Sequence, residues 1–246
     1  MEPWYFILLA LTGIAAGFIN VMAAGGSLIS MPILIFLGLE PAMANGTNRV
    51  AILVQNITAV SSFRSKGLSE FRLSLSLAMC TIPGAIAGAF AAVAVNPELF
   101  KRILGAVLIL AVILISRRGA PTPTSDGQRT WPVLAHLGMV GAGFYGGFLQ
   151  AGVGFVIMPI LFRLLQMNLV RVNMHKVFIV GVYTIPALLV FAFGDKVWWL
   201  GGFALATGNA VGAWIATHVT ISHGERAIKV VFTLAVIAMG AKLLFG

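Results

Sequence analysis

The stretch "AAGGSLISMPILIF", residues 23–36, interrupts a long hydrophobic run with a pair of glycines. The apolar segment after them, residues 27–39, would rise only about 20 Å as a helix. That is too short for a hydrocarbon core of about 30 Å, whereas residues 4–24 are long enough to cross it. Because Pro32 also disfavours a continuous helix, we expect residues 4–39 to form a hairpin broken near the membrane interior.

The same pattern returns later in the chain as "QAGVGFVIMPILFR", residues 150–163, with the Met-Pro pair in the same place. The chain therefore divides into two related halves, residues 1–119 and 131–246. Residues 120–130, which begin "APTPTSDGQR", have the Pro, Ser and Gly content of a flexible polar linker.

Composition places both halves in a membrane. Hydrophobic residues make up 59% of the 246 residues and charged residues 9%, whereas a soluble domain has about 25% charged residues. Apolar runs long enough to span a bilayer recur along the chain, without the alternating pattern of a membrane β-barrel. We therefore predict an all-α, polytopic integral membrane protein.

Each half contains five apolar segments, and an odd number per half makes the second half inverted relative to the first. In the first half the segments span residues 4–24, 27–39, 42–63, 71–95 and 99–117. Transporters use inverted repeats with interrupted helices to place a binding site near the bilayer midplane and to expose it alternately to each side. The predicted fold is therefore two inverted five-segment repeats with interrupted hairpin helices.

Basic residues at the segment ends predict the orientation, because cytoplasmic loops are enriched in Lys and Arg. With the N-terminus outside, the loops expected in the cytoplasm contain ten: Arg64, Lys66, Arg72, Arg117, Arg118, Arg129, Arg163, Arg171, Arg226 and Lys229. The loops expected outside contain four: Lys101, Arg102, Lys196 and Lys242. We therefore expect a multi-pass protein of the inner (plasma) membrane with both termini outside. Its first apolar segment is interpreted as a span rather than a cleaved signal peptide.

The acidic residues argue against several classes of function. All seven lie at segment ends or in loops: Glu2, Glu40, Glu70, Glu98, Asp126, Asp195 and Glu225. A cation transporter or a carboxylate-based proton pump needs one inside a span, and a metal-dependent phosphotransferase needs a carboxylate cluster. The net charge of +9 is scattered rather than gathered for nucleic acid, and Cys80 is the sole cysteine. We predict no enzymatic activity, no cofactor, no metal site and no nucleic-acid partner.

Arg49, in the stretch "GTNRV", is the unusual charge. The helical rise from Arg49 to Arg64 is about 22 Å, so Arg49 should lie some 8 Å below the membrane face. An arginine at the centre of a membrane helix costs roughly 2.5–3.5 kcal/mol. Because Asn45, Thr47 and Asn48 crowd the same turn, we interpret it as a polar pocket. The alternative is that Arg49 snorkels to the interface.

Asn173, His175 and Lys176 occupy the corresponding place in the second half, although the longer separation of Lys176 from Asp195 places Lys176 nearer the interface. Arg49 offers a planar fork of donors and Lys176 a compact charge, and both suit an oxyanion. His175 is the candidate for proton coupling, because histidine titrates near physiological pH. Its alternative role is a hydrogen bond to a neighbouring helix.

The glycine-rich breaks complete the predicted site. Glycine lets backbone approach a ligand closely, and the N–H groups at the start of a helix favour an anion. The predicted substrate-binding residues are Gly25, Gly26, Ser27, Asn45, Thr47, Asn48, Arg49, Gln150, Gly152, Asn173, His175 and Lys176.

The stretch "AGGSLISMPILIFLGLEPAMANGTNRVAIL", residues 24–53, resembles the signature of the sulfite exporter TauE/SafE family. The resemblance rests on a glycine-rich break, a following proline, and Gly-Thr-Asn near the start of the next helix. Residues 141–180 resemble the second copy, although "GVG" replaces a fuller glycine run and "NMHK" replaces Gly-Thr-Asn-Arg. The resemblance implies a carrier of small sulfur-containing or organic anions such as sulfite, sulfoacetate or other sulfonates. The residues on the family motif are Gly25, Gly26, Ser27, Thr47 and Asn48.

The expected function is a secondary transporter, working as an exporter of such anions by alternating access. An anion channel and a membrane subunit without transport activity are the alternatives. The expected partners are the small anionic substrate and the lipid bilayer. The sequence leaves open which anion is carried, the direction of transport, the coupling ion, and whether the chain works as a homo-oligomer.

Overall fold

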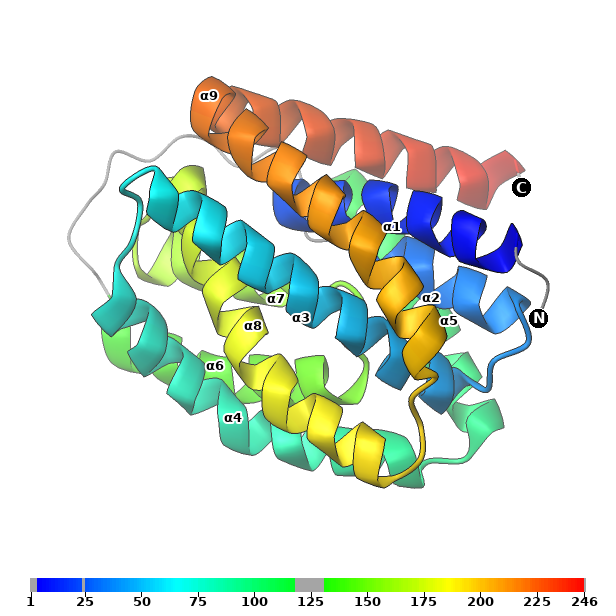
Figure 1. Cartoon of the computed structure of the whole chain (residues 1–246). Helices are drawn as coiled ribbons and strands as arrows, with labels where there is room; N and C mark the ends of the chain where they lie inside the picture. Colours follow the sequence, from blue (N-terminus) through cyan, green and yellow to red (C-terminus); the bar gives the residue numbers. More distant parts are fainter. Residues whose placement is uncertain (1–3, 24, 118–130, 246) are drawn as a thin grey trace.

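The computed structural model describes residues 4–23, 25–117 and 131–245, with side chains described except at 23, 108–117 and 224–245. Over these ranges the chain is helical, which confirms the all-α prediction. The helices are α1 (Trp4–Ala23), α2 (Ser27–Phe36), α3 (Pro41–Ser65), α4 (Phe71–Ala94), α5 (Pro97–Arg117), α6 (Pro132–Phe148), α7 (Gly154–Pro159), its π-helical continuation η1 (Ile160–Leu164), α8 (Leu169–Phe193) and α9 (Trp199–Phe245) (Figure 1). The predicted linker at 120–130 lies outside the described residues.

The helices of the first half begin and end within three residues of the predicted segments. Three of the described helices are long and apolar enough to cross a membrane: Trp4–Met22, Phe71–Ala94 and Leu169–Phe193. Two shorter apolar helices, Ser27–Phe36 and Gly154–Leu164, follow the two interruptions. The chain therefore has the helices of a polytopic membrane protein.

Helix α9 has 47 residues and would be about 70 Å long if straight, more than twice the thickness of the hydrocarbon core. Figure 1 shows that it turns back sharply at its labelled end, so that it forms two arms. These arms correspond in order to the fourth and fifth segments predicted for the second half. The inversion of one half relative to the other remains a prediction.

Helices of one half pack against helices of the other, because α1 lies along α9 and α4 lies along α6. Glycines make both contacts close. A Cβ on Gly13 would overlap the carbonyl oxygen of Leu205, and one on Gly143 would overlap that of Thr81. The same kind of overlap with backbone oxygen would occur at Gly17, Gly84, Gly88, Gly147, Gly208 and Gly212. Small residues at four-residue spacing allow membrane helices to pack at this distance, and here they join one half to the other.

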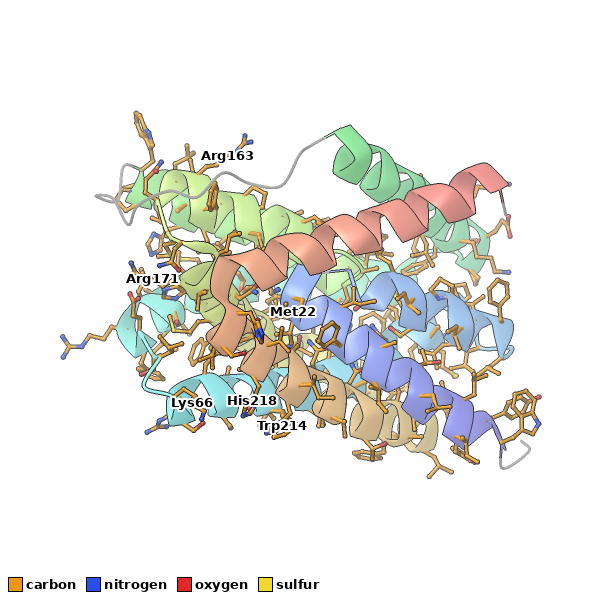
Figure 2. The ribbon with its side chains drawn as sticks, turned by 90° about the horizontal axis from the view of Figure 1, so that it is seen from above. Met22, Lys66, Arg163, Arg171, Trp214 and His218 are labelled. Carbon is orange, nitrogen blue, oxygen red and sulfur yellow. The ribbon has the colours of Figure 1, made fainter. Side chains whose placement is uncertain are left out.

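The two ends of the bundle carry different features. Figure 2 shows Lys66, Arg163 and Arg171 at the same end. Helix α1 begins and helix α9 ends at the opposite end (Figure 1). These three basic residues therefore lie together, away from the start of α1 and the end of α9, whereas the orientation in the membrane remains a prediction.

Candidate functional site

Both predicted interruptions are present. Residues 24–26 separate α1 from α2, and residues 149–153 separate α6 from α7. In the second break Gln150 and Gly152 have φ angles of 62° and 72°, in the left-handed region that side-chain-bearing residues rarely adopt. The Oε1 of Gln150 accepts a hydrogen bond of 3.2 Å from the hydroxyl of Tyr183. This contact connects the break to α8.

The first break is packed inside the bundle. Gly25, Gly26 and Ser27 are all buried. A Cβ on Gly26 would overlap the carbonyl oxygen of Ala16 in α1. Close helix packing is therefore sufficient to require glycine at this position, and a role in ligand binding for these three residues remains a prediction.

The two breaks face each other across one pair of apolar side chains. A Cβ on Gly25 would lie 3.5 Å from Cζ of Phe155 and 3.7 Å from Cδ1 of Leu28. A Cβ on Gly152 would lie 3.3 Å from Cδ2 of Phe155 and 3.6 Å from Cδ2 of Leu28. The alignment of 23–36 with 150–163 matches Gly25 with Gly152 and Leu28 with Phe155. Equivalent residues of the two halves therefore meet where the interrupted hairpins converge.

Arg49 on α3 is fully buried and binds the end of α6. Its Nη2 donates to the carbonyl oxygens of Gly146, at 3.1 Å, and of Gly147, and its Nη1 donates to Oε1 of Gln150 at 3.3 Å. The guanidinium carbon lies 4.6 Å from the centre of the Phe191 ring. The last carbonyl groups of a helix lack intrahelical partners and carry partial negative charge, so they suit a cation. Arg49 therefore points into the bundle and does not snorkel to the interface.

Lys176 on α8 makes the matching contact with the end of α1. Its Nζ donates to the carbonyl oxygens of Asn20 at 3.0 Å and Val21 at 2.7 Å, and to Oδ1 of Asn173 at 3.0 Å. Only 3% of Lys176 is exposed. Each cation thus caps the helix that leads into the break of the opposite half, as Arg49 does for α6.

Three buried N–H donors of the predicted site residues have no hydrogen-bond partner among the described residues: Asn48 Nδ2, Arg49 Nε and Asn173 Nδ2. Ser30 on α2 donates to Oδ1 of Asn48 at 2.7 Å, which leaves the Nδ2 of that amide as the available donor. A buried unpaired donor costs about 1–3 kcal/mol. A ligand oxygen that accepted hydrogen bonds from these groups would therefore be stabilised.

Asn45 and Thr47 are used in contacts between helices. The Nδ2 of Asn45 donates to the carbonyl oxygen of Phe148 at 2.7 Å, at the end of α6. The hydroxyl oxygen of Thr47 accepts from the backbone N–H of Trp198 at 2.9 Å, just before α9. Both residues lie on the same helix as Arg49 but connect it to the second half of the chain.

His175 joins a different group of side chains. Its Nδ1 lies 2.8 Å from the hydroxyl of Ser74, and its Nε2 lies 3.7 Å from Oε2 of Glu70. Arg171 donates to both oxygens of Glu70, at 2.6 and 2.8 Å. Glu70 and Ser74 also line a cavity of about 450 Å³ at the start of α4. These contacts connect His175 to α4, and not to Arg49.

A group of amides near Lys176, with Gln55 and Asn209 buried and Asn20 partly buried, was not predicted from the sequence. The Oε1 of Gln55 accepts from Nδ2 of Asn20 at 3.2 Å and from Nδ2 of Asn209 at 3.3 Å. The carbonyl oxygen of Asn20 in turn binds Lys176. The available signal was the presence of uncharged amides inside apolar spans, where polar residues are rare and tend to face the bundle interior.

Arg49 and Lys176 are the buried arginine and lysine among the side chains that the structure describes, and no carboxylate is buried with them. A helix end supplies about half a negative charge, so the two caps neutralise only about half of the two positive charges. In an interior of low polarity the remaining charge attracts an anion. The described residues contain no cluster of three potential metal ligands from His, Cys, Asp and Glu.

Comparisons with known proteins identify the family of the chain. The chain is 30% identical over 251 residues to "Probable membrane transporter protein YfcA" of Escherichia coli (strain K12), covering 100% of this chain and 91% of that protein. It is 27% identical to "Probable membrane transporter protein ORF9" of Sinorhizobium sp, over 99% and 95% of the two chains. A "Probable membrane transporter protein" of Haemophilus influenzae is 26% identical, over 97% and 94%. No solved structure matches the chain. The profile of "Sulfite exporter TauE/SafE" matches residues 9–243, so the chain belongs to the sulfite exporter TauE/SafE family of membrane transporters.

Proposed function

We propose that the chain is a secondary transporter that exports small sulfur-containing or organic anions, such as sulfite or the organosulfonate sulfoacetate. The observation that carries the proposal is the burial of Arg49 and Lys176 without a buried carboxylate among the described residues. Two buried cations are unfavourable unless an anion or a strong dipole compensates them. The helix ends provide part of this compensation, and a substrate anion would provide the rest.

The anion would bind beside α3, close to the two breaks. Asn48 Nδ2 and Arg49 Nε are unpaired donors on that helix, and Ser30 connects Asn48 to α2. Asn173 and Lys176 provide the equivalent groups from α8. We expect a site near the bilayer midplane between two inverted repeats, because such repeats expose a central site alternately to each side.

We propose that the protein lies in the inner membrane. The end with Lys66, Arg163 and Arg171 would face the cytoplasm, and both termini would lie outside. The grouping of Lys66, Arg163 and Arg171 at one end supports this orientation (Figure 2), since basic loops are retained in the cytoplasm. Proton coupling through His175 belongs to the same proposal. The proposal includes no enzymatic activity, because the related proteins are described as membrane transporters.

An anion channel and a membrane subunit without transport activity remain the alternatives. Proteoliposomes with the purified protein distinguish them when tested with radiolabelled sulfite, sulfate, sulfoacetate, isethionate, taurine and acetate. Uptake by a carrier saturates and is accelerated by unlabelled anion on the opposite side of the membrane, whereas uptake through a channel is not accelerated in this way. If no anion moves and none raises the melting temperature, the transport proposal is wrong.

A further inference from the structure

The point where the two breaks converge is filled by Leu28 and Phe155. Each side chain lies 3.3–3.7 Å from the place that a Cβ would take on Gly25 and on Gly152, so each extends from its own break toward that of the other half. Leu28 is 5% exposed and Phe155 is partly buried. No polar side chain is needed to complete this contact.

Apolar side chains are unexpected at the centre of an anion path. The neighbouring breaks and the caps of Arg49 and Lys176 are polar. A narrow passage lined by hydrocarbon excludes water, and an anion cannot enter it without losing its hydration. An anion path that ran between the breaks would therefore be closed to ions by this pair in the present conformation.

The contact is also connected to Arg49. Leu28 belongs to a buried cluster with Leu149 and Phe191, and Phe155 packs against that cluster. The ring of Phe191 carries the guanidinium of Arg49 on its face. Through Phe191, the cluster therefore connects the pair to Arg49.

The two members of the pair differ in the regularity of their helices. Leu28 is in the first turn of α2, a helix of ten residues. Phe155 is in α7, which has six residues, continues into the π-helix η1, and follows the left-handed Gln150 and Gly152. Irregular helical turns of this kind are frequent at functional sites. Phe155 is therefore the member better placed to move.

We propose that Leu28 and Phe155 form the central gate of the anion path, with Phe155 as its moving part, and that their combined size limits the anions that pass. This inference rests on the proposed function. When the gate is closed, it separates the two halves of the path. When Phe155 turns aside, the width left beside Leu28 determines which anion fits.

The test compares uptake of a size series, from sulfite through sulfoacetate to benzenesulfonate, by wild-type, Phe155→Ala and Leu28→Ala proteins in liposomes. Both variants should admit benzenesulfonate at least about tenfold faster than wild type, which corresponds to a barrier lower by about 1.4 kcal/mol. Phe155→Leu, which makes the pair Leu–Leu, should give an intermediate size limit. That milder variant keeps the test valid if an alanine variant does not fold.

Leu34→Ala is the matched control, because Leu34 is a fully buried leucine of the same helix that packs in a different cluster. It should lose stability like Leu28→Ala but keep the wild-type size limit. If Phe155 and Leu28 variants that fold also keep that limit while wild type transports sulfite, the gate is disproved and the transport function stands. If the wild type moves no anion of the panel, the proposed function itself fails.

Discussion

Arg49 and Lys176 stand at equivalent positions of the two halves, and each binds the carbonyl end of a helix in the opposite half. Arg49 caps α6 and Lys176 caps α1, so the two contacts run in opposite directions between the halves. Each cation therefore stabilises the interruption of the other half. This structural role exists beside any role in binding an anion, and experiments must separate the two.

Replacing Arg49 tests both roles. In Arg49→Gln the carbonyl groups of Gly146 and Gly147 lose their charged donor, so the variant should be less stable by about 1.5–3 kcal/mol. It should also lose the rise in melting temperature that a substrate anion produces. Arg49→Lys keeps the charge but not the planar fork, and should retain a smaller rise. Thermal unfolding of the purified variants, with and without anion, measures both effects.

Arg64→Gln is the control for this prediction, since Arg64 is an exposed arginine in the last turn of the same helix. Both its stability and its response to anion should be those of the wild type. An Arg49→Gln protein that is less stable but still responds fully to anion would show that Arg49 caps α6 and does not bind the anion.

Asn48→Asp tests whether a fixed carboxylate can replace the bound anion. Oδ1 can still accept from Ser30, whereas the free Nδ2 donor is lost. The new negative charge adjoins Arg49 in the chain and should repel or replace the substrate. We expect the melting temperature to become independent of added anion and uptake into liposomes to be abolished.

Asn56→Asp is its control, because Asn56 is equally buried on the same helix and its Nδ2 donates to Ile52 of the helix itself. This variant should be less stable, since an unpaired carboxylate is buried, but anion should still raise its melting temperature. Equal behaviour of the two variants would show that position 48 has no special relation to the anion.

Two glycines of α6 test the close packing of the halves. A Cβ on Gly143 would overlap the carbonyl oxygen of Thr81, whereas a Cβ on Gly141 would meet open space. Gly143→Ala should therefore force α4 and α6 apart and lower the melting temperature by several degrees. Gly141→Ala should be neutral or slightly stabilising, because alanine is the better helix former. If both variants melt alike in detergent, the described contact does not stabilise the fold.

The sequence was sufficient to predict the helices and breaks of the first half, because apolar segment length and glycine position depend on local sequence. The burial of Arg49 could also be predicted, since several helical turns separate it from Arg64 at the end of the same apolar segment. The partners of Arg49 and Lys176 could not be predicted. They are carbonyl groups of the opposite half, and a backbone carbonyl has no signature in the sequence.

The placement of His175 shows the same limit. Its match to Asn48 predicts a position in the polar site, yet the structure connects it to Ser74 and Glu70 on the side of α4. The sequence repeat shows which positions of two helices correspond. It does not show which helices of the other half pack against those positions. Gln55 was not predicted for a related reason. Its role depends on hydrogen bonds from Asn20 and Asn209, which lie far from it in the sequence.

His175→Asn tests proton coupling, because it installs the residue found at the equivalent position 48. The groups described beside His175 are Ser74 of α4 and Glu70, which directly precedes α4, with Arg171 of its own helix paired to Glu70. If His175 takes up the coupling proton, an imposed pH gradient should accelerate anion uptake by wild type and leave the variant unaffected. Anion binding without a gradient should persist in the variant, since the described contacts of His175 run to Ser74 and Glu70.

His136→Asn serves as the comparison for this variant, because His136 is also hydrogen bonded to a serine, Ser76, but is only partly buried. Its uptake should respond to the gradient as wild type does. Should His175→Asn keep the full response, the proton is carried elsewhere or not at all, and His175 with Ser74 serves only to join α8 to α4. That result would leave the proposed anion site intact, since the described contacts of His175 and those of Arg49 involve different residues.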